Sequence, residues 1–186
     1  LFDIEDVNKA PSAFNTEKLL WLNQHYIKSD DPARVAHLLS PHIGEQGVDP
    51  AQWPPLKEAV AMQAERAKSL LDLAALCAVF YKDEVEYSEK GAKKNMKAAA
   101  IEPLTKVKEK IAALDDWSRE KLHDIILGTA EELDVKMGKV GMPLRFAITG
   151  GIASGDLDLT LYLAGKENCL KRIERALDYI QQKTAG

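Results

Sequence analysis

The chain has 186 residues, of which 46% are hydrophobic and 29% charged, a composition typical of a globular protein that can bury a core. No stretch approaches the roughly 20 apolar residues of a membrane-spanning helix, so the sequence predicts no such helix in this chain. The net charge of −4 argues weakly against a general nucleic-acid binder. The charge is uneven, however: residues 1–84 hold 8 basic and 13 acidic side chains, whereas residues 85–186 hold 17 and 16.

Helical periodicity dominates the first half of the chain. Asn15 is a good N-cap, and apolar residues at helical spacing follow it to Ile27. Asp31 followed by Pro32 predicts the start of a second helix. This second helix is expected to run from Pro32 until Pro41 and the glycines at 44 and 47 end it. A third helix is expected from residue 56 through Arg66 to Ser69, and a fourth over residues 70–81.

A polar break at residues 83–88 coincides with the shift in charge, and we place a domain boundary between residues 84 and 85. Beyond it the pattern predicts helices over residues 88–99, 104–114, about 118–133, 143–149, 156–164 and 167–183. The only β-like run, residues 146–149, is four residues long. The sequence therefore predicts an all-α fold of about ten helices in two small helical bundles in tandem, residues 1–84 and 85–186.

The stretch KMGKVGMPLRFAITGG, residues 136–151, suggests a catalytic loop, a phosphate cradle or a loop that presents one arginine, and residues 136–142 are not expected to be helical. Two fragments are similar to ATP-binding signatures of class I aminoacyl-tRNA synthetases: HIGE at 42–45 and KMGKV at 136–140. Each lacks key residues of its signature, and no strand of a dinucleotide-binding fold accompanies either fragment. We therefore expect neither to be catalytic.

No other catalytic or metal-binding constellation is visible in the sequence. The four histidines show no metal-ligand spacing, and the carboxylates are scattered on faces expected to be solvated. The glycine-rich TGGIASG lacks the terminal lysine and hydroxyl residue of a phosphate-binding loop. Cys77 and Cys169 lie in apolar helical contexts, which indicates buried free thiols in a reducing cytosol.

Basic residues recur at helical spacing, at Lys90, Lys93, Lys94 and Lys97, then at Lys106 and Lys110, and again at Lys171, Arg172 and Arg175. These positions form either ordinary surface faces or a face that contacts phosphates. Arg66 and Arg145 differ, because each lies between small or apolar residues. Each guanidinium is therefore either paired internally, which the pattern alone favours, or aimed at a nucleobase.

Three segments resemble the C-terminal part of bacterial glutamyl-tRNA synthetase, in the order and spacing of that family. They are FNTEKLLWLNQHYI (14–27), MGKVGMPLRFAITG (137–150) and LAGKENCLKRIERALDYI (163–180). The resemblance implies the all-helical anticodon-binding region of this class I enzyme, with the end of the stem-contact segment before it. The catalytic domain would then precede Leu1, and the absence of an initiator Met suggests a processed product or an excised fragment.

The resemblance also implies roles for individual residues. Arg145 would contact the middle anticodon base, Arg66 the third, and Ser154, Gly155 and Leu157 would surround the first. An arginine at position 66 is typical of family members that exclude tRNA(Gln). Where the family often has Ser-Pro or Thr-Pro, this chain has Ser154-Gly155, which weakens the first-base assignment. From position we add Lys93, Lys97, Lys136 and Lys139 as candidate phosphate contacts.

The function expected from the resemblance is recognition of the tRNA(Glu) anticodon, within a cytoplasmic enzyme that ligates glutamate to tRNA(Glu) using ATP and Mg²⁺. This chain would itself hold no catalytic residue, metal or cofactor. Its partners would be tRNA(Glu) and the catalytic and stem-contact domains of the same protein, with no membrane. The alternative is a helical protein–protein interaction module without an RNA role, which the acidic net charge favours when the resemblance is set aside.

Overall fold

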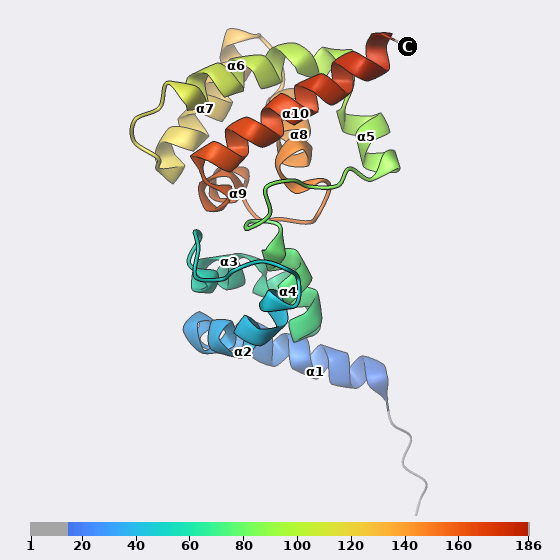
Figure 1. Cartoon of the computed structure of the whole chain (residues 1–186), viewed down its shortest axis with the longest axis vertical. Helices are drawn as coiled ribbons and strands as arrows, with labels where there is room; N and C mark the ends of the chain where they lie inside the picture. The colour runs from blue at the N-terminus through green and yellow to red at the C-terminus, as the bar shows by residue number, and fades with distance from the viewer. Residues whose placement is uncertain (1–14, 186) are drawn as a thin grey trace, which may run out of the picture.

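Residues 15–185 are described here by a computed structural model, in which they form α-helices and short 3₁₀ turns with no strand (Figure 1). This confirms the all-α prediction. The helices are α1 (Thr16–Ser29), α2 (Pro32–Gly44), α3 (Leu56–Gln63), α4 (Leu70–Ala78), α5 (Glu89–Asn95), α6 (Ile101–Ala112), α7 (Arg119–Glu132), α8 (Met137–Thr149), α9 (Leu157–Ala164) and α10 (Lys166–Ala185), with 3₁₀ turns η2 (Ala64–Arg66) and η3 (Ala98–Ala100). None of these helices is long and apolar enough to cross a bilayer.

The first four helices pack mainly on one another, with α2 against both α3 and α4. Two of them begin where side-chain caps predict. Asn15 Oδ1 accepts a hydrogen bond from the Lys18 amide at 3.0 Å, and Asp31 Oδ1 accepts one from the Ala33 amide at 3.0 Å. These bonds satisfy amides that a helix leaves without partners at its start.

Helices α5–α10 form a second group, in which α10 crosses α6, α8 and α9 (Figure 1). Apolar side chains at helical spacing fill its centre, and Leu104, Ile111, Leu122, Leu144 and Ile173 are all fully buried there. Each helix contributes an apolar stripe to this centre, and its buried residues belong to one cluster with those of the first group.

Residues 79–88 connect the two groups, and a buried arginine of α10 holds this connection. Arg172 is 1% exposed, and it donates hydrogen bonds to the carbonyl oxygens of Ile148 at 2.6 Å, Val79 at 2.7 Å and Lys82. Burial lowers the pKa of this guanidinium. The domain boundary expected between residues 84 and 85 falls within the connection, and its exact position stays a prediction.

The largest difference from the predicted helices concerns α8, which begins at Met137 rather than near residue 143. Two glycines and Pro143 give this segment a low helix propensity, and Pro143 cannot donate to the carbonyl of Lys139. The segment is nevertheless helical because Val140 and Leu144, one turn apart, are fully buried in the core. Tertiary packing here outweighs local propensity.

Helix ends differ by smaller amounts. The basic helix α5 ends at Asn95 instead of 99, where Met96 leaves the helical region with ψ of 71° before the 3₁₀ turn η3. Helix α4 ends at Ala78, three residues early. Helix α6 begins at Ile101, so that Pro103 lies in its first turn, where its missing N–H costs no hydrogen bond.

Candidate nucleic-acid interface

The loop between α8 and α9, residues 150–156, is the centre of the candidate site. It lies on the side of its bundle that faces α3 and α4 (Figure 1). Gly150 ends α8 with a positive φ of 65°, and a Cβ there would lie 2.2 Å from the carbonyl oxygen of Glu86. Only glycine fits this turn without strain, so the sequence determines how the chain leaves α8.

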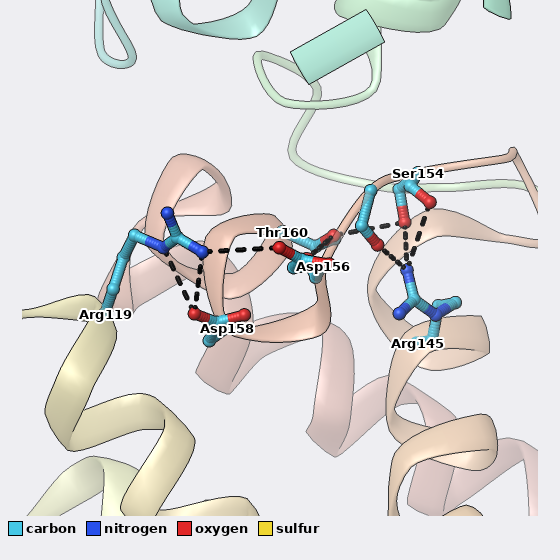
Figure 2. Close-up of polar contacts among 7 residues, drawn as sticks. Arg119, Arg145, Ser154, Asp156, Asp158 and Thr160 are labelled. Carbon is cyan, nitrogen blue, oxygen red and sulfur yellow. Dashed lines mark hydrogen bonds and ion pairs between the residues drawn. The ribbon is translucent and has the colours of Figure 1, made fainter.

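Arg145, in the last turn but one of α8, holds this loop with a single nitrogen (Figure 2). Its Nη1 donates to Ser154 Oγ at 2.7 Å, to the Gly155 carbonyl at 2.5 Å and, more weakly, to the Ser154 carbonyl at 3.3 Å. The other nitrogens, Nε and Nη2, have no hydrogen-bond partner among residues 15–185, and neither is fully buried. The half-buried guanidinium therefore keeps donors for a ligand.

The electrostatic surroundings of Arg145 are mixed. Burial lowers the pKa of its guanidinium, and the charge of Arg66 lowers it further, whereas Asp156 and Asp158 raise it. An arginine nevertheless stays protonated at physiological pH. The charge of Arg66 thus acts at Arg145, and both arginines add to the positive charge on this side of the protein.

Helix α9 fixes the far end of the same loop. Thr160 Oγ1 contacts the Asp156 carbonyl at 2.7 Å and Ser154 Oγ at 3.1 Å (Figure 2). Asp158 accepts two hydrogen bonds from Arg119 of α7, at 2.9 and 3.1 Å. With both ends bonded, the loop needs little further ordering to bind a ligand.

Arg66 lies at the end of η2 and is exposed. Its Nη1 donates to the Met62 carbonyl at 2.8 Å, which fixes the side chain against α3. The preceding Glu65 pairs with Lys28 of α1 at 2.7 Å, and this partner lowers the pKa of Glu65. Helix α1 thus supports the turn that presents Arg66.

The residues assigned to the first base lie in the same loop but differ in exposure. Ser154 and Gly155 are half-buried, whereas Leu157, in the first turn of α9, is only 8% exposed. Ser154 Oγ is already bonded to both Arg145 and Thr160. The structure therefore brings these three residues together with Arg145, and what they contact in RNA stays a prediction.

Three of the four candidate phosphate-binding lysines line one hollow of about 370 Å³ between α5 and α8, which we call the lysine hollow. These are Lys97, Lys136 and Lys139, which are joined there by Lys94. No carboxylate is found among its lining residues. Lys93 is exposed on α5 outside the hollow. None of these five lysines forms an ion pair with the described part of the chain.

Lys90 is exposed and forms no ion pair with the described residues, whereas the other basic residues singled out in the sequence are engaged within the protein. Lys106 and Lys110 of α6 both pair with Glu132 of α7, whose pKa they hold at about 2. Arg172 is buried, as described above, and Arg175 donates to the Val85 carbonyl at 2.9 Å. The basic strip expected along these helices is therefore mainly structural.

Sequence reasoning missed two residues beside Arg145. Met142 is 46% exposed and, with Asn95, lines both the lysine hollow and an adjoining hollow of about 310 Å³ that also contains Arg145 and Ser154. Asn95 donates its amide to the Gly91 carbonyl at 3.0 Å, which leaves its side-chain oxygen free within the described structure. Met142 is three residues before Arg145. A prediction of α8 over its full length would therefore have placed both side chains on one face of this helix.

The polar groups around Arg145 form an arrangement suited to binding. The thiols of Cys77 and Cys169 are buried and their pKa values are raised to about 12. Across residues 15–185 no cluster of histidine, cysteine and carboxylate side chains is placed to hold a metal ion. Arg145 lines one hollow without carboxylates and another, of about 440 Å³, that also contains Asp156 and Asp158. Its unpaired donors suit the recognition of unstacked bases.

Comparison with known proteins agrees with this geometry. Residues 34–177 match the family model described as an anticodon binding domain. The whole chain is 46% identical to glutamate–tRNA ligase 1 of Alkalilimnicola ehrlichii and covers 40% of that protein. A solved glutamate tRNA ligase from Elizabethkingia meningosepticum has a TM-score of 0.82 at 26% identity, over 96% of this chain and 35% of that one.

A second solved structure, glutamate-tRNA synthetase from Elizabethkingia anophelis, has a TM-score of 0.77 at 27% identity, over 95% of this chain and 34% of that one. The chain thus spans about 40% or less of the length of these relatives. The similarity covers both helical groups and the connection between them.

Proposed function

This chain belongs to the anticodon-binding domain family, and we propose that it recognises the anticodon of tRNA(Glu) as the C-terminal region of a cytoplasmic glutamate–tRNA ligase. The observation that carries the proposal is Arg145, which uses one nitrogen to hold its loop and keeps two others for a ligand. Family membership disfavours the alternative of a helical interaction module without an RNA role.

Ligation of glutamate, with its ATP and Mg²⁺, is proposed for the parts of such a ligase that this chain does not include. The two fragments that are similar to ATP-binding signatures do not fit that role here. Residues 42–45 lie at the end of α2, and residues 136–140 at the start of α8, whereas a nucleotide-binding signature belongs at the junction of a strand and a helix.

Recognition by Arg145 follows from the physics of an RNA loop. Bases of an anticodon can be unstacked, and their edges then carry acceptors for hydrogen bonds. A guanidinium that is held by Nη1 can offer Nε and Nη2 side by side, which suits a base edge. We assign the middle base to Arg145, the third to Arg66, and the first to the surroundings of Ser154, Gly155 and Leu157.

The lysine hollow supplies the part of the binding free energy that does not depend on sequence. Lys97, Lys136 and Lys139 line it, and no carboxylate competes for them there. A phosphate bound there would release counterions, so affinity would fall as salt rises. Because no carboxylate lines this hollow, the local charge rather than the net charge governs phosphate binding there.

The experiment is a titration of the chain with an anticodon stem-loop of tRNA(Glu) and with one in which the middle base is changed. Arg145→Ala should reduce the preference for the cognate loop by about 1–3 kcal/mol, that is, from about fivefold to about 150-fold. Lys139→Ala should weaken both loops equally and lower the salt dependence. Arg34→Ala is the matched control, since Arg34 is exposed on α2 and, within residues 15–185, pairs with Asp30 alone.

An absence of stem-loop binding at low salt would refute the proposal. So would an Arg145→Ala protein that keeps the full preference of the parent. A chain that binds a protein partner but no RNA would instead support the interaction module.

A further inference from the structure

Gln63, the last residue of α3, is an uncharged polar side chain in an unusual place. It is fully buried, at 0% exposure, although amide side chains are mostly found at protein surfaces. It also lies where the first helical group meets the loop of residues 150–156. A buried amide needs hydrogen-bond partners to offset the loss of water.

The partners of Gln63 fix the direction of its amide. Nε2 donates to the Ala153 carbonyl at 3.0 Å and approaches the Leu76 carbonyl at 3.5 Å. Because both neighbours are acceptors, the opposite orientation would set oxygen against oxygen. The remaining atom, Oε1, is buried without a hydrogen-bond partner among residues 15–185.

The bond to Ala153 joins two segments that are 90 residues apart in the chain. On one side, the adjacent Met62 accepts the hydrogen bond of Arg66 through its carbonyl. On the other side, Ala153 directly precedes Ser154 and Gly155, which accept the hydrogen bonds of Arg145. Gln63 thus stands between the supports of the two arginines.

A second contact reinforces the same junction. Gly155 lies so close to Met62 that an added Cβ would be 3.2 Å from two of its side-chain carbons. The loop therefore rests on α3 through one apolar contact and one polar bond. The apolar contact allows sliding, whereas the hydrogen bond sets one register.

We propose that Gln63 is a positioning residue that holds the loop around Arg145 in register with Arg66, so that recognition of the two anticodon bases is coupled. This inference rests on the proposed function. The unpartnered Oε1 makes Gln63 a costly choice for stability alone. A variant with an apolar residue of similar volume at position 63 should fold at least as well but lose the register, because no other hydrogen bond within residues 15–185 ties Ala153 to α3.

The test is a cycle of Arg66→Ala, Arg145→Ala and the double variant, titrated with tRNA(Glu) anticodon stem-loops. In the parent, the fold-loss of affinity of the double variant should differ from the product of the two single fold-losses by about threefold or more. In the Gln63→Met background, the fold-loss of affinity of the double variant should agree with the product of the two single fold-losses to within about twofold. Gln63→Met should change the free energy of unfolding in urea little, and this result separates a positioning role from a purely structural one.

Gln52→Met is the matched control, because Gln52 is exposed in the loop before α3, and it should leave the coupling at the parent value. If Gln63→Met fails to fold, Gln63→Asn takes its place. The asparagine side chain keeps the polar amide, but it is one methylene too short to reach Ala153. Additive losses in the parent, or full coupling in the Gln63 variant, would overturn the inference. Failure of the parent to bind the stem-loop, or no effect of Arg145→Ala alone, would instead remove the proposed function.

Discussion

At the scale of single residues, Arg145 combines two roles that the sequence analysis presents as alternatives. Its pattern favours an internal role, and the family resemblance implies contact with a base. The structure shows one nitrogen bonded within the protein and two without partners in the described residues. A side chain with five donors in a rigid fork can do both at once, and this is the physical reason that the pattern alone could not choose.

Arg66 gives a prediction about discrimination between tRNAs. Arg66→Gln removes the charge and the donors assigned to the third base, and the shorter amide should accept a wider range of bases. The difference in affinity between tRNA(Glu) and tRNA(Gln) stem-loops should narrow by several-fold, on the order of 1 kcal/mol. Filter binding or calorimetry would measure it, with Arg34→Gln as the control; an unchanged difference would remove the assignment of Arg66.

Met142 gives a second prediction at this scale. It is exposed between the lysine hollow and the hollow of Arg145, where a bound nucleotide would cover its side chain. Met142→Ala should weaken stem-loop binding by about 1 kcal/mol, from the apolar area no longer buried, and leave salt dependence unchanged. Met137→Ala, at a comparably exposed methionine of the same helix, is the comparison, and equal effects of the two would argue against a specific contact.

The buried thiols give a prediction about pH. Burial raises the pKa values of Cys77 and Cys169 to about 12, compared with about 8.5 for an exposed thiol. Between these values the folded state keeps its protons while the unfolded state loses them, so stability should fall as pH rises above about 8.5. At pH 8 a thiol reagent should label neither cysteine in the native protein and both in urea. Rapid native labelling would contradict their burial.

At the scale of elements, α8 and the loop after it show what local sequence can and cannot specify. The sequence indicates a special segment with its glycines, Pro143 and Arg145, and the predicted end of the helix at residue 149 is confirmed. The first six residues of α8 are not predicted to be helical, because their helical state depends on the burial of Val140 against distant helices. Helix propensity is a weak preference that such packing overrides.

Gly150 gives a prediction about this element. A Cβ at a φ of 65°, only 2.2 Å from the Glu86 carbonyl, would strain the turn and push the connection away. Gly150→Ala should lower the free energy of unfolding by about 1–3 kcal/mol, as measured in urea. Gly128→Ala is the control, because that glycine lies within α7 with no atom of another element within 4 Å, and it should stabilise by roughly 0.5–1 kcal/mol.

At the scale of the whole molecule, polar bonds across the connection determine how the two helical groups sit. Arg172 binds the carbonyls of Val79 and Lys82, and Gln63 binds that of Ala153. Tyr162 adds a third link, since its carbonyl accepts from Trp53 of the first group at 3.4 Å and from Trp117 of the second at 3.1 Å. The recognition of neighbouring bases that we propose for Arg66 and Arg145 would require this arrangement, because the two arginines belong to different groups.

Arg172 gives a prediction about this arrangement. Arg172→Met keeps much of the volume but leaves three carbonyl groups without their donor. Each buried unsatisfied group costs roughly 1 kcal/mol or more, so the loss should be about 2–4 kcal/mol. Denaturant unfolding would show it, with Lys171→Met, at the exposed neighbour, expected to lie within about 0.5 kcal/mol of the parent. Similar stability of the two variants would contradict the role of Arg172.

The sequence by itself determined the helical class, most helix starts and the arginines worth attention, because periodicity, caps and turn residues act over a few neighbouring positions. The tertiary structure alone decided that α8 begins at Met137, that Arg172 is a buried link rather than a surface charge, and that Gln63 meets Ala153. Each of these depends on a residue far away in the chain, whose position no local pattern encodes.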